Sequence, residues 1–594
     1  MNIGNWHFLS ESSGPRRALK LLRFLAWFAA ACTGVLQIWA FRFWLSPDGN
    51  TYLDIASNYL RGDWKNVVNA YWSPLFSWLL ACCLAIFHPG PYLESTLLHL
   101  LNFVAFLLSL LTFEFFFRAF LSARTQLGWA TLENEVLSEA VWWALGYGLF
   151  FSTSLFVLSL NITTPDIWVA VWTFLVAGLI LRIRTAGGGL TLFAALGLTL
   201  ACAYLTKSFY FPMSLVFLLT AWLASGAPRK ALKDVALGLA IFILFAGPWV
   251  FLLSRAKHRL TFGDVGKLAY AISIDDIAQS FYWQGENATG IPKHPVRQLL
   301  TKPRLFEFGT PVGGSYPPTY DESYWMEGAS PHFNLKGQLR VLRQSFGTMF
   351  LFFTDQAEYA VGLLVFFFFI KDKFIYAAAL RKQWFLWAPP LAACLSYSLV
   401  LTEGRYVAPF LLLLWVAAFS CLLGKPSSGA SCAAHAVVFA MLSVTGLRIA
   451  KSATSDVLAI LGHPENTNFK VAQALYSLGI RPGDKVAGLS HMAQAHWARL
   501  AGVKIVSQIP PTDAYIFWAA DAETKLKVFQ VFASTGAKVV ITKDPPPFAL
   551  DKNWIALGNT GFFAHRLPDQ VRGDARAEST ASDQISPPGS QTPQ

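Results

Sequence analysis

Charged residues are scarce in this sequence. Only 14% of the 594 residues are Asp, Glu, Lys or Arg, whereas 54% are hydrophobic. A soluble globular chain carries about 25% charged residues, so the deficit predicts long segments without charge, which is typical of membrane proteins. The formal net charge of +12 is compatible with nucleic-acid binding, but basic loops on the cytoplasmic side of a membrane explain it better.

Cysteine is sparse too, and its spacing argues against two kinds of site. Cys82 and Cys83 are adjacent, and the rest of the seven cysteines stand singly in or beside apolar segments. This spacing matches neither a zinc site nor a disulfide framework. We interpret the cysteines as small apolar side chains of a helix bundle. The sequence therefore indicates no certain cofactor.

Long apolar segments fill most of the chain. They cover residues 21–43, 72–87, 93–120, 141–160, 167–181, 190–205, 209–223, 235–253, 349–370, 384–401, 406–423 and 433–447. The first follows a basic stretch and lacks the cleavage site of a signal peptide, so we expect it to remain as the first span. Because a helix needs about 20 residues to cross the hydrocarbon layer, the segments predict an α-helical polytopic membrane protein. We expect about 11 to 13 membrane helices.

Basic residues between the segments predict the orientation, because Lys and Arg collect in cytoplasmic loops. The residues expected on that side are residues 1–20, Arg124, Arg182, Arg229 and Lys371. These basic residues all lie on the same side of the membrane only if one of the early apolar segments does not cross it. Segment 72–87 is the shortest and is bracketed by Pro74 and Pro89, so we expect it to dip into the membrane or to lie on its outer surface.

The composition becomes globular near the C-terminus. Helical periodicity in residues 469–478 is followed by short apolar runs at residues 486–489, 503–509 and 537–542, with helical segments between them. Such alternation predicts a small α/β domain with a mostly parallel sheet. Residues 554–557 and 562–567 are predicted to form a closing hairpin around Gly558.

These patterns divide the chain into four parts. We expect a cytoplasmic N-terminus (1–20), a transmembrane domain (21–450) with outer loops at 45–72 and 254–343, an extracytoplasmic α/β domain (451–567) and a disordered tail (568–594). A first span without cleavage and the absence of a disulfide framework fit a bacterial inner membrane. The oligomeric state is open.

The first outer loop contains the leading catalytic candidate, Asp48. An acidic residue at the membrane rim, followed by a short amphipathic helix, can act as a general base towards a hydroxyl group. Partial removal from water and nearby carboxylates would keep its pKa raised and usable. The alternative is that Asp48 caps the helix predicted over residues 51–60.

Three more charged residues stand at segment ends on the same predicted side. Asp166 opens one segment, where an acid is costly unless it is used; its alternative role is a helix N-cap. Lys207 can neutralise a phosphate, or its ammonium group can reach the interface while its stem stays buried. Arg405 can bind phosphate oxygens with two donors at once, unless Glu403 holds it in an ion pair.

The loop at 254–343 combines aromatic, acidic and histidine side chains. Together with Tyr52 and Glu403, the candidates for ligand recognition are His294, Tyr316, Tyr320, Asp321 and Trp325. Aromatic rings stack on the C–H faces of sugars, and carboxylates bind sugar hydroxyls. The alternative for the aromatic residues is that they anchor the loop at the membrane interface. His294 alone does not make a metal site.

The first outer loop also carries a family resemblance. The string from Asp48-Gly49 through Tyr52, Arg61-Gly-Asp-Trp64 and Tyr71-Trp-Ser-Pro-Leu75 resembles the first external loop of the GT-C glycosyltransferase superfamily. The branch it is most similar to contains protein O-mannosyltransferases and the lipid A aminoarabinose transferase. Members often have Asp-Glu where this chain has Asp48-Gly49, so a second adjacent carboxylate is absent here.

The resemblance implies a membrane glycosyltransferase that moves a hexose or pentose from a polyprenyl-phosphate carrier to a hydroxyl on a glycan, lipid or protein. It implies that Asp48 is the catalytic carboxylate, that Asp166 faces the same cavity, and that Arg405 binds the donor phosphate, to which we add Lys207. Some members hold a divalent metal near this site and others do not, so a metal stays open here.

Two alternatives belong to other classes. A transporter or lipid flippase also has charged residues at breaks between spans, but it should show paired repeats and charge in mid-membrane. A non-catalytic scaffold would use its outer α/β domain to bind a partner. The scaffold gains support if Asp48, Asp166, Lys207 and Arg405 do not meet in one cavity.

Overall fold

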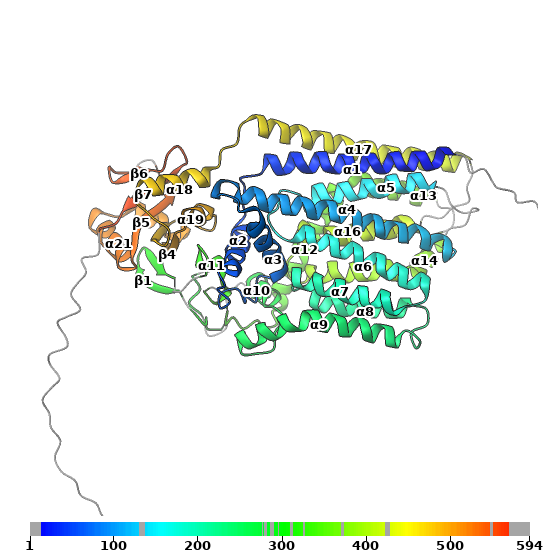
Figure 1. Cartoon of the computed structure of the whole chain (residues 1–594), viewed down its shortest axis with the longest axis horizontal. Helices are drawn as coiled ribbons and strands as arrows, with labels where there is room; N and C mark the ends of the chain where they lie inside the picture. The colour runs from blue at the N-terminus through cyan, green and yellow to red at the C-terminus, as the bar shows by residue number, and fades with distance from the viewer. Residues whose placement is uncertain are drawn as a thin grey trace, which may run out of the picture.

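Long helices form one bundle, and a smaller sheet-containing domain sits at one end of it (Figure 1). The structure, a computed structural model, describes residues 13–129, 137–275, 277, 282–285, 290–294, 296–308, 313–324, 327–369, 373–421, 428–546 and 550–568. The main helices are α1 (Ser13–Ala40), α3 (Pro74–Phe87), α4 (Glu94–Gln126), α5 (Glu139–Ser152), α6 (Asp166–Ala186), α7 (Leu190–Thr206), α8 (Tyr210–Ala224), α9 (Leu232–Lys257), α12 (Leu335–Asp355), α13 (Ala357–Phe369), α14 (Lys373–Lys382), α15 (Trp384–Ser398), α16 (Gly404–Ser420) and α17 (Ser428–Leu461). Shorter helical segments are α2 (Pro47–Leu60), η1 (Pro91–Leu93), η2 (Thr153–Leu158), α10 (Val265–Ser273), α11 (Pro317–Tyr320) and η3 (Glu322–Tyr324).

The helix bundle has the lengths and the surface of a membrane domain. Within the described residues, six helices are long and apolar enough to cross a membrane, and α12 with α13, bent by 81°, makes a seventh if the pair is one span. Four more apolar helices, α3, α7, α8 and α16, are shorter. In α1, α9 and α17 only 22% of the most apolar stretch is buried, so these helices expose an apolar surface suited to lipid. The chain is a multi-pass membrane protein, as predicted.

Helix α3 covers the segment that was not expected to cross. Its 14 residues extend about 21 Å at 1.5 Å per residue, which is short of a hydrocarbon layer about 30 Å thick. Figure 1 shows α2 and α3 together at the end of the bundle that faces the sheet domain. This position agrees with a segment that stays at one end of the bundle; the side of the membrane remains a prediction.

The C-terminal domain is built on a seven-stranded sheet with helices on both faces. Its strands are β1 (Arg297–Thr301), β2 (Arg304–Glu307), β3 (Lys485–Leu489), β4 (Lys504–Ile509), β5 (Ala537–Lys543), β6 (Trp554–Ala556) and β7 (Phe562–Arg566), in the order β1-β2-β4-β3-β5-β7-β6. Strands β4, β3 and β5 are parallel. Adjacent residues of β3 point to opposite faces: Val486 packs with α18 (Thr467–Ser477) and α19 (His496–Ala501), and Ala487 with α20 (Pro511–Ala519) and α21 (Ala522–Ser534).

Two predictions about this domain need correction and one holds. The predicted hairpin is confirmed, because β6 and β7 pair antiparallel. The sheet is larger than residues 451–567 can make, since β1 and β2 come from the 254–343 loop and β2 pairs with β4 through Phe306 and Gln508. The boundary expected after residue 450 falls inside α17, which runs on to Leu461. The amino-acid composition of α17 does not change where this helix leaves the bundle, so composition could not mark the boundary.

The alternation of helix direction brings the charged segment ends together. Asp166 is the first residue of α6, Lys207 directly follows α7, and Arg405 is in the first turn of α16. Helix α7 is placed by close contact with α9, where Gly197 meets the backbone of Gly238. The absence of a side chain at Gly197 thus sets the position of the helix that leads to Lys207.

Replacing this glycine tests the packing. A Cβ at Gly197 would lie 2.1 Å from the Gly238 carbonyl oxygen, so Gly197→Ala must push α7 and α9 apart, and overpacking costs typically about 1–3 kcal/mol. We expect a lower midpoint of thermal unfolding in detergent. Gly446→Ala in α17 is the control, because a Cβ there meets nothing within 4 Å, and it gains the same helix propensity. Equal midpoints for the two variants would contradict the close contact.

Candidate active site

Asp48 lies in the first turn of α2 and is not the helix cap. The N-cap is Ser46, whose side chain accepts a hydrogen bond from the Gly49 amide at 3.1 Å and contacts the Thr163 hydroxyl at 2.6 Å. The alternative role proposed for Asp48 is therefore wrong, because Ser46 satisfies the cap. The Asp48 carboxylate, 35% exposed, is left to face Arg405.

Asp166 is buried at the start of α6 with three partners. Its carboxylate accepts hydrogen bonds from the Thr164 hydroxyl at 2.6 Å and from the Lys207 ammonium at 2.5 Å, and Arg405 Nη1 lies 3.7 Å from its second oxygen. The N-cap position belongs to Pro165, so Asp166 is not a cap either. A carboxylate that is only 3% exposed needs such partners to stay charged.

The two cations approach the site from different helices. Lys207 extends from the end of α7, with its ammonium 3.5 Å from the centre of the Tyr406 ring. Arg405 reaches Glu403 through Nε at 2.6 Å, the Tyr406 hydroxyl through Nη2 at 3.2 Å and Asp48 through Nη1 at 3.4 Å. The ion pair with Glu403, which was the alternative to phosphate binding for Arg405, is present through Nε. Nη1 is directed at Asp48.

These side chains line one cavity of about 420 Å³. Asp48, Asp166, Lys207 and Arg405 all belong to its wall, and Tyr52 does too. The apolar part of the wall contains Phe209, Pro212, Phe262, Val265, Tyr397, Val400 and Leu401. The cavity wall therefore combines charged and apolar side chains, a combination that suits a ligand with an anionic group and a hydrocarbon chain.

The charges around Asp48 act on its pKa in both directions. Burial raises the pKa of the Asp48 carboxyl above its ordinary value, and the Arg405 guanidinium opposes that rise. The carboxylates of Asp166 and Glu403 add to it. A carboxylate with a raised pKa holds a proton more readily than an ordinary aspartate, which suits a group that must accept one.

The side chains predicted from the long loop are placed elsewhere. The Tyr316 hydroxyl donates to Gln508 at 2.7 Å inside the sheet domain, and Tyr320 is buried against α2, where its hydroxyl accepts from Asn58 at 2.6 Å. Asp321 accepts from the Ser323 amide in a turn. None of these three lines the cavity, because each side chain ties the loop to its neighbours.

The other two loop predictions have separate outcomes. His294 is exposed and is absent from the cavity wall. Trp325 lies outside the described residues. The prediction that this loop supplies aromatic residues to the cavity thus finds no support from Tyr316, Tyr320 or His294.

Sequence reasoning missed several residues of the wall. Tyr71 and Trp72 line the cavity beside Tyr52, and Tyr406 lies against both cations. Lys267, an exposed residue of α10, adds a further positive charge at the wall. Tyr406 could have been found as the neighbour of Arg405, whereas nothing in the sequence around Lys267 indicated its position.

Gly49 stands where the resembling family often has a second acid, and the structure gives a physical reason for the glycine. A Cβ at this position would lie 2.6 Å from the Thr163 hydroxyl oxygen and 2.8 Å from a Leu45 methyl group. Both contacts are closer than real Cβ atoms tolerate. A side chain at position 49 would therefore require Thr163 or Leu45 to move, and no acid follows Asp48 directly in this chain.

The carboxylates in and beside the cavity have side-chain cations as partners. The Asp166 carboxylate is bound by Lys207, and that of Glu403 is bound by Arg405. Across the part of the chain that the structure describes, no three His, Cys, Asp or Glu side chains are grouped as metal ligands. The residues present balance these carboxylates with side-chain cations instead.

The fold has a solved counterpart. No protein-family model matches the chain, and no curated protein is a significant match to it. The structure is similar to ArnT from Cupriavidus metallidurans, solved bound to undecaprenyl phosphate, with a TM-score of 0.51, 13% identity and coverage of 90% of this chain and 97% of that chain. The oligosaccharyltransferase of Archaeoglobus fulgidus, in complex with Zn and sulfate, matches with a TM-score of 0.46, 14% identity and coverage of 88% of this chain and 68% of that chain. The likeness to ArnT confirms the predicted GT-C fold.

A double-mutant cycle tests the charge balance at Asp166. Lys207→Met leaves a buried carboxylate with fewer partners, and removing one partner of a buried pair costs about 3–5 kcal/mol. We expect Asp166→Asn combined with Lys207→Met to lower the midpoint of thermal unfolding by less than the sum of the two single effects. Additive effects would show that the two side chains do not depend on each other.

Proposed function

We propose that the chain is an integral-membrane glycosyltransferase. It transfers a hexose or pentose from a polyprenyl-phosphate carrier to a hydroxyl group of a glycan, lipid or protein acceptor. The observation that carries the proposal is the shared cavity, in which a carboxylate with a raised pKa, two cations and an apolar wall meet. The structure of ArnT, which has a similar fold, holds undecaprenyl phosphate, a lipid of the proposed donor class.

The cavity suits both parts of such a donor. An anionic phosphate fits beside Lys207 and Arg405, since a planar guanidinium can donate two hydrogen bonds to phosphate oxygens. The isoprenoid chain would lie along the apolar wall that includes Phe209, Val400 and Leu401. Lys267 adds positive charge to the same wall.

The reaction follows from where the charges stand. Asp48 takes the proton of the acceptor hydroxyl, and the oxygen attacks the anomeric carbon of the sugar. The bond from that carbon to the phosphate oxygen breaks, and the polyprenyl phosphate leaves with the electron pair and with negative charge that Lys207 and Arg405 stabilise. Direct displacement inverts the anomeric centre.

Donor binding should also prepare the base. Arg405 opposes the rise in the pKa of Asp48 through Nη1, 3.4 Å away. A phosphate that takes up this donor weakens the opposition, so the pKa of Asp48 rises when the donor is bound. A higher pKa makes the carboxylate a stronger acceptor of the hydroxyl proton.

The other classes find less support. A transporter needs access to its site from both faces, whereas the charged residues gather at the ends of α6, α7 and α16. A scaffold has no need for two cations and two carboxylates in one cavity. For the enzyme we propose a bacterial inner membrane, a cytoplasmic N-terminus and an extracytoplasmic sheet domain, because the cytoplasmic side carries the basic loops.

Asp48→Asn tests the base. The amide keeps the shape of the side chain but cannot accept the proton, so we expect release of undecaprenyl phosphate from undecaprenyl-phosphate-linked hexoses or pentoses to fall by at least about 100-fold. Binding of the same donors should be retained. Asp63→Asn is the control, since this acid of the same loop is absent from the cavity wall. Full turnover by Asp48→Asn would remove Asp48 from its role.

The pH dependence tests the electrostatics. Turnover requires ionised Asp48, whose pKa is raised from 3.8, so kcat/KM should fall with decreasing pH earlier than an ordinary aspartate would cause. Arg405→Gln removes the group that lowers this pKa, so the acid limb of the pH profile of kcat/KM should move to higher pH. The affinity for the donor should fall too, because Arg405 is a proposed partner of the phosphate. An unchanged acid limb would contradict the assignment of Asp48 and Arg405 as neighbours in the reaction.

A further inference from the structure

Helix α2 carries more than the proposed base. Asp48 is in its first turn, and Asp54 follows six positions later on a different face of the same helix. This second face is buried and polar: Asn50, Thr51, Asp54 and Asn58 are all less than 7% exposed. Buried polar groups need partners, so the position of α2 depends on whatever satisfies them.

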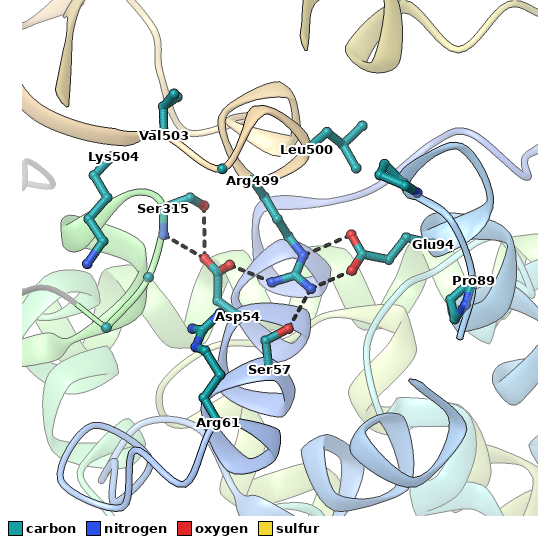
Figure 2. A pocket seen from close by; sticks show the side chains of 14 residues that line it. Asp54, Ser57, Arg61, Pro89, Glu94, Ser315, Arg499, Leu500, Val503 and Lys504 are labelled. Carbon is teal, nitrogen blue, oxygen red and sulfur yellow. Dashed lines mark hydrogen bonds and ion pairs between the residues drawn. The ribbon is translucent and has the colours of Figure 1, made fainter. Parts of the chain in front are cut away.

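A single arginine of the C-terminal domain supplies the charged partner. Figure 2 shows Arg499, which extends from α19 towards α2 and the start of α4. Its Nη1 donates to Asp54 at 2.8 Å, its Nη2 to the Ser57 hydroxyl at 2.7 Å and its Nε to Glu94 at 2.9 Å. A second bond from Nη2 completes a bidentate pair with Glu94. The guanidinium thus joins α2 to α4 from outside the membrane bundle.

The long loop completes the same contact. The second oxygen of Asp54 accepts from both the amide and the hydroxyl of Ser315, each at 2.8 Å. Asn50, one turn earlier in α2, donates to the Ser315 hydroxyl at 3.0 Å. Asp54 therefore has partners on both sides, Arg499 from α19 and Ser315 from the loop, and neither partner belongs to a membrane helix.

We propose that Arg499 is a positioning residue which holds α2, and with it Asp48, in place from the C-terminal domain. The inference rests on the proposed function, and it extends the active site to a domain that contributes no side chain to the cavity wall given above. The reason is mechanical: α2 is one helix of 14 residues, so fixing its second face fixes its first turn.

The geometry at Asp48 makes a small displacement matter. Arg405 Nη1 stands 3.4 Å from the Asp48 carboxylate, at the limit of a hydrogen bond. A shift or rotation of α2 lengthens this contact and moves the carboxylate away from the acceptor hydroxyl. A misplacement of about 1 Å at a reacting group costs on the order of 100-fold in rate.

Three variants with matched chemistry test the proposal. Arg499→Gln removes the charge, Arg499→Lys keeps it but loses the planar fork, and Asp54→Asn weakens the pair from the other side while preserving shape. We expect kcat to fall by about 10- to 100-fold in Arg499→Gln, with the KM for undecaprenyl-phosphate sugars changed less than twofold. The acid limb should move to higher pH as the Asp48–Arg405 contact lengthens, and Arg499→Lys should recover part of kcat.

Arg304→Gln is the control. Arg304 forms a bidentate pair with Asp513 in the same sheet domain, Nε with Oδ2 and Nη2 with Oδ1, and neither residue lines the proposed catalytic cavity. Its loss perturbs the sheet domain without touching α2, so kcat and the acid limb should stay at their wild-type values. If Arg499→Gln cannot be purified as a folded protein, Asp54→Asn takes its place in every measurement.

Hydrogen–deuterium exchange gives a readout that does not require activity. Exchange of the amides in residues 47–60 should speed up in Arg499→Gln and not in Arg304→Gln. If the wild type transfers no sugar but this difference holds, the proposed function fails while the control of α2 by Arg499 stands. If the wild type is active and Arg499→Gln matches it in kcat, acid limb and exchange, the inference is overturned.

Discussion

The structure depends on the stabilisation of a buried carboxylate, that of Asp166, at one end of an apolar helix bundle. A carboxylate as buried as Asp166 costs several kcal/mol unless cations and hydrogen bonds compensate for it. Lys207 and Arg405 do so from two other helices, and Thr164 does so from the residues just before α6. Those partners are available only because α6, α7 and α16 present their polar ends at the same place. The charge balance thus requires the helix arrangement, and the helix arrangement creates the cavity.

The sequence was informative about the site because charge is rare in it. With 14% charged residues, an acid or a base at the end of an apolar segment is conspicuous, and Asp48, Asp166, Lys207 and Arg405 were all predicted and all line one cavity. Details of capping were not predictable: Ser46 and Asp48 are both good N-cap residues, and only the backbone geometry selects Ser46.

Contacts between distant segments account for the other failures. Tyr316 and Tyr320 were candidates for sugar recognition because aromatic rings stack on the C–H faces of sugars. Their hydroxyls instead bond to Gln508 and Asn58, far away in the sequence. Strands β1 and β2 have five and four residues, too few for a periodic pattern, and their partner strand is not deducible from spacing. The role of Arg499 was not predictable, because arginine is common in a domain of globular composition and its partners, Asp54, Ser57 and Glu94, are distant in the sequence.

The sheet also imposes an order on assembly. Strand β2 lies between two membrane helices in the sequence, yet Phe306 pairs with Gln508 in a strand made after the last helix of the bundle. While the chain is being synthesised, β1 and β2 are complete before β4 is made, so their hairpin has one unpaired edge, and an unpaired edge favours association with other chains. Closure of such a distant contact is slow compared with local helix formation. The edge of β2 therefore stays unpaired until β4 has been synthesised and can pair with it.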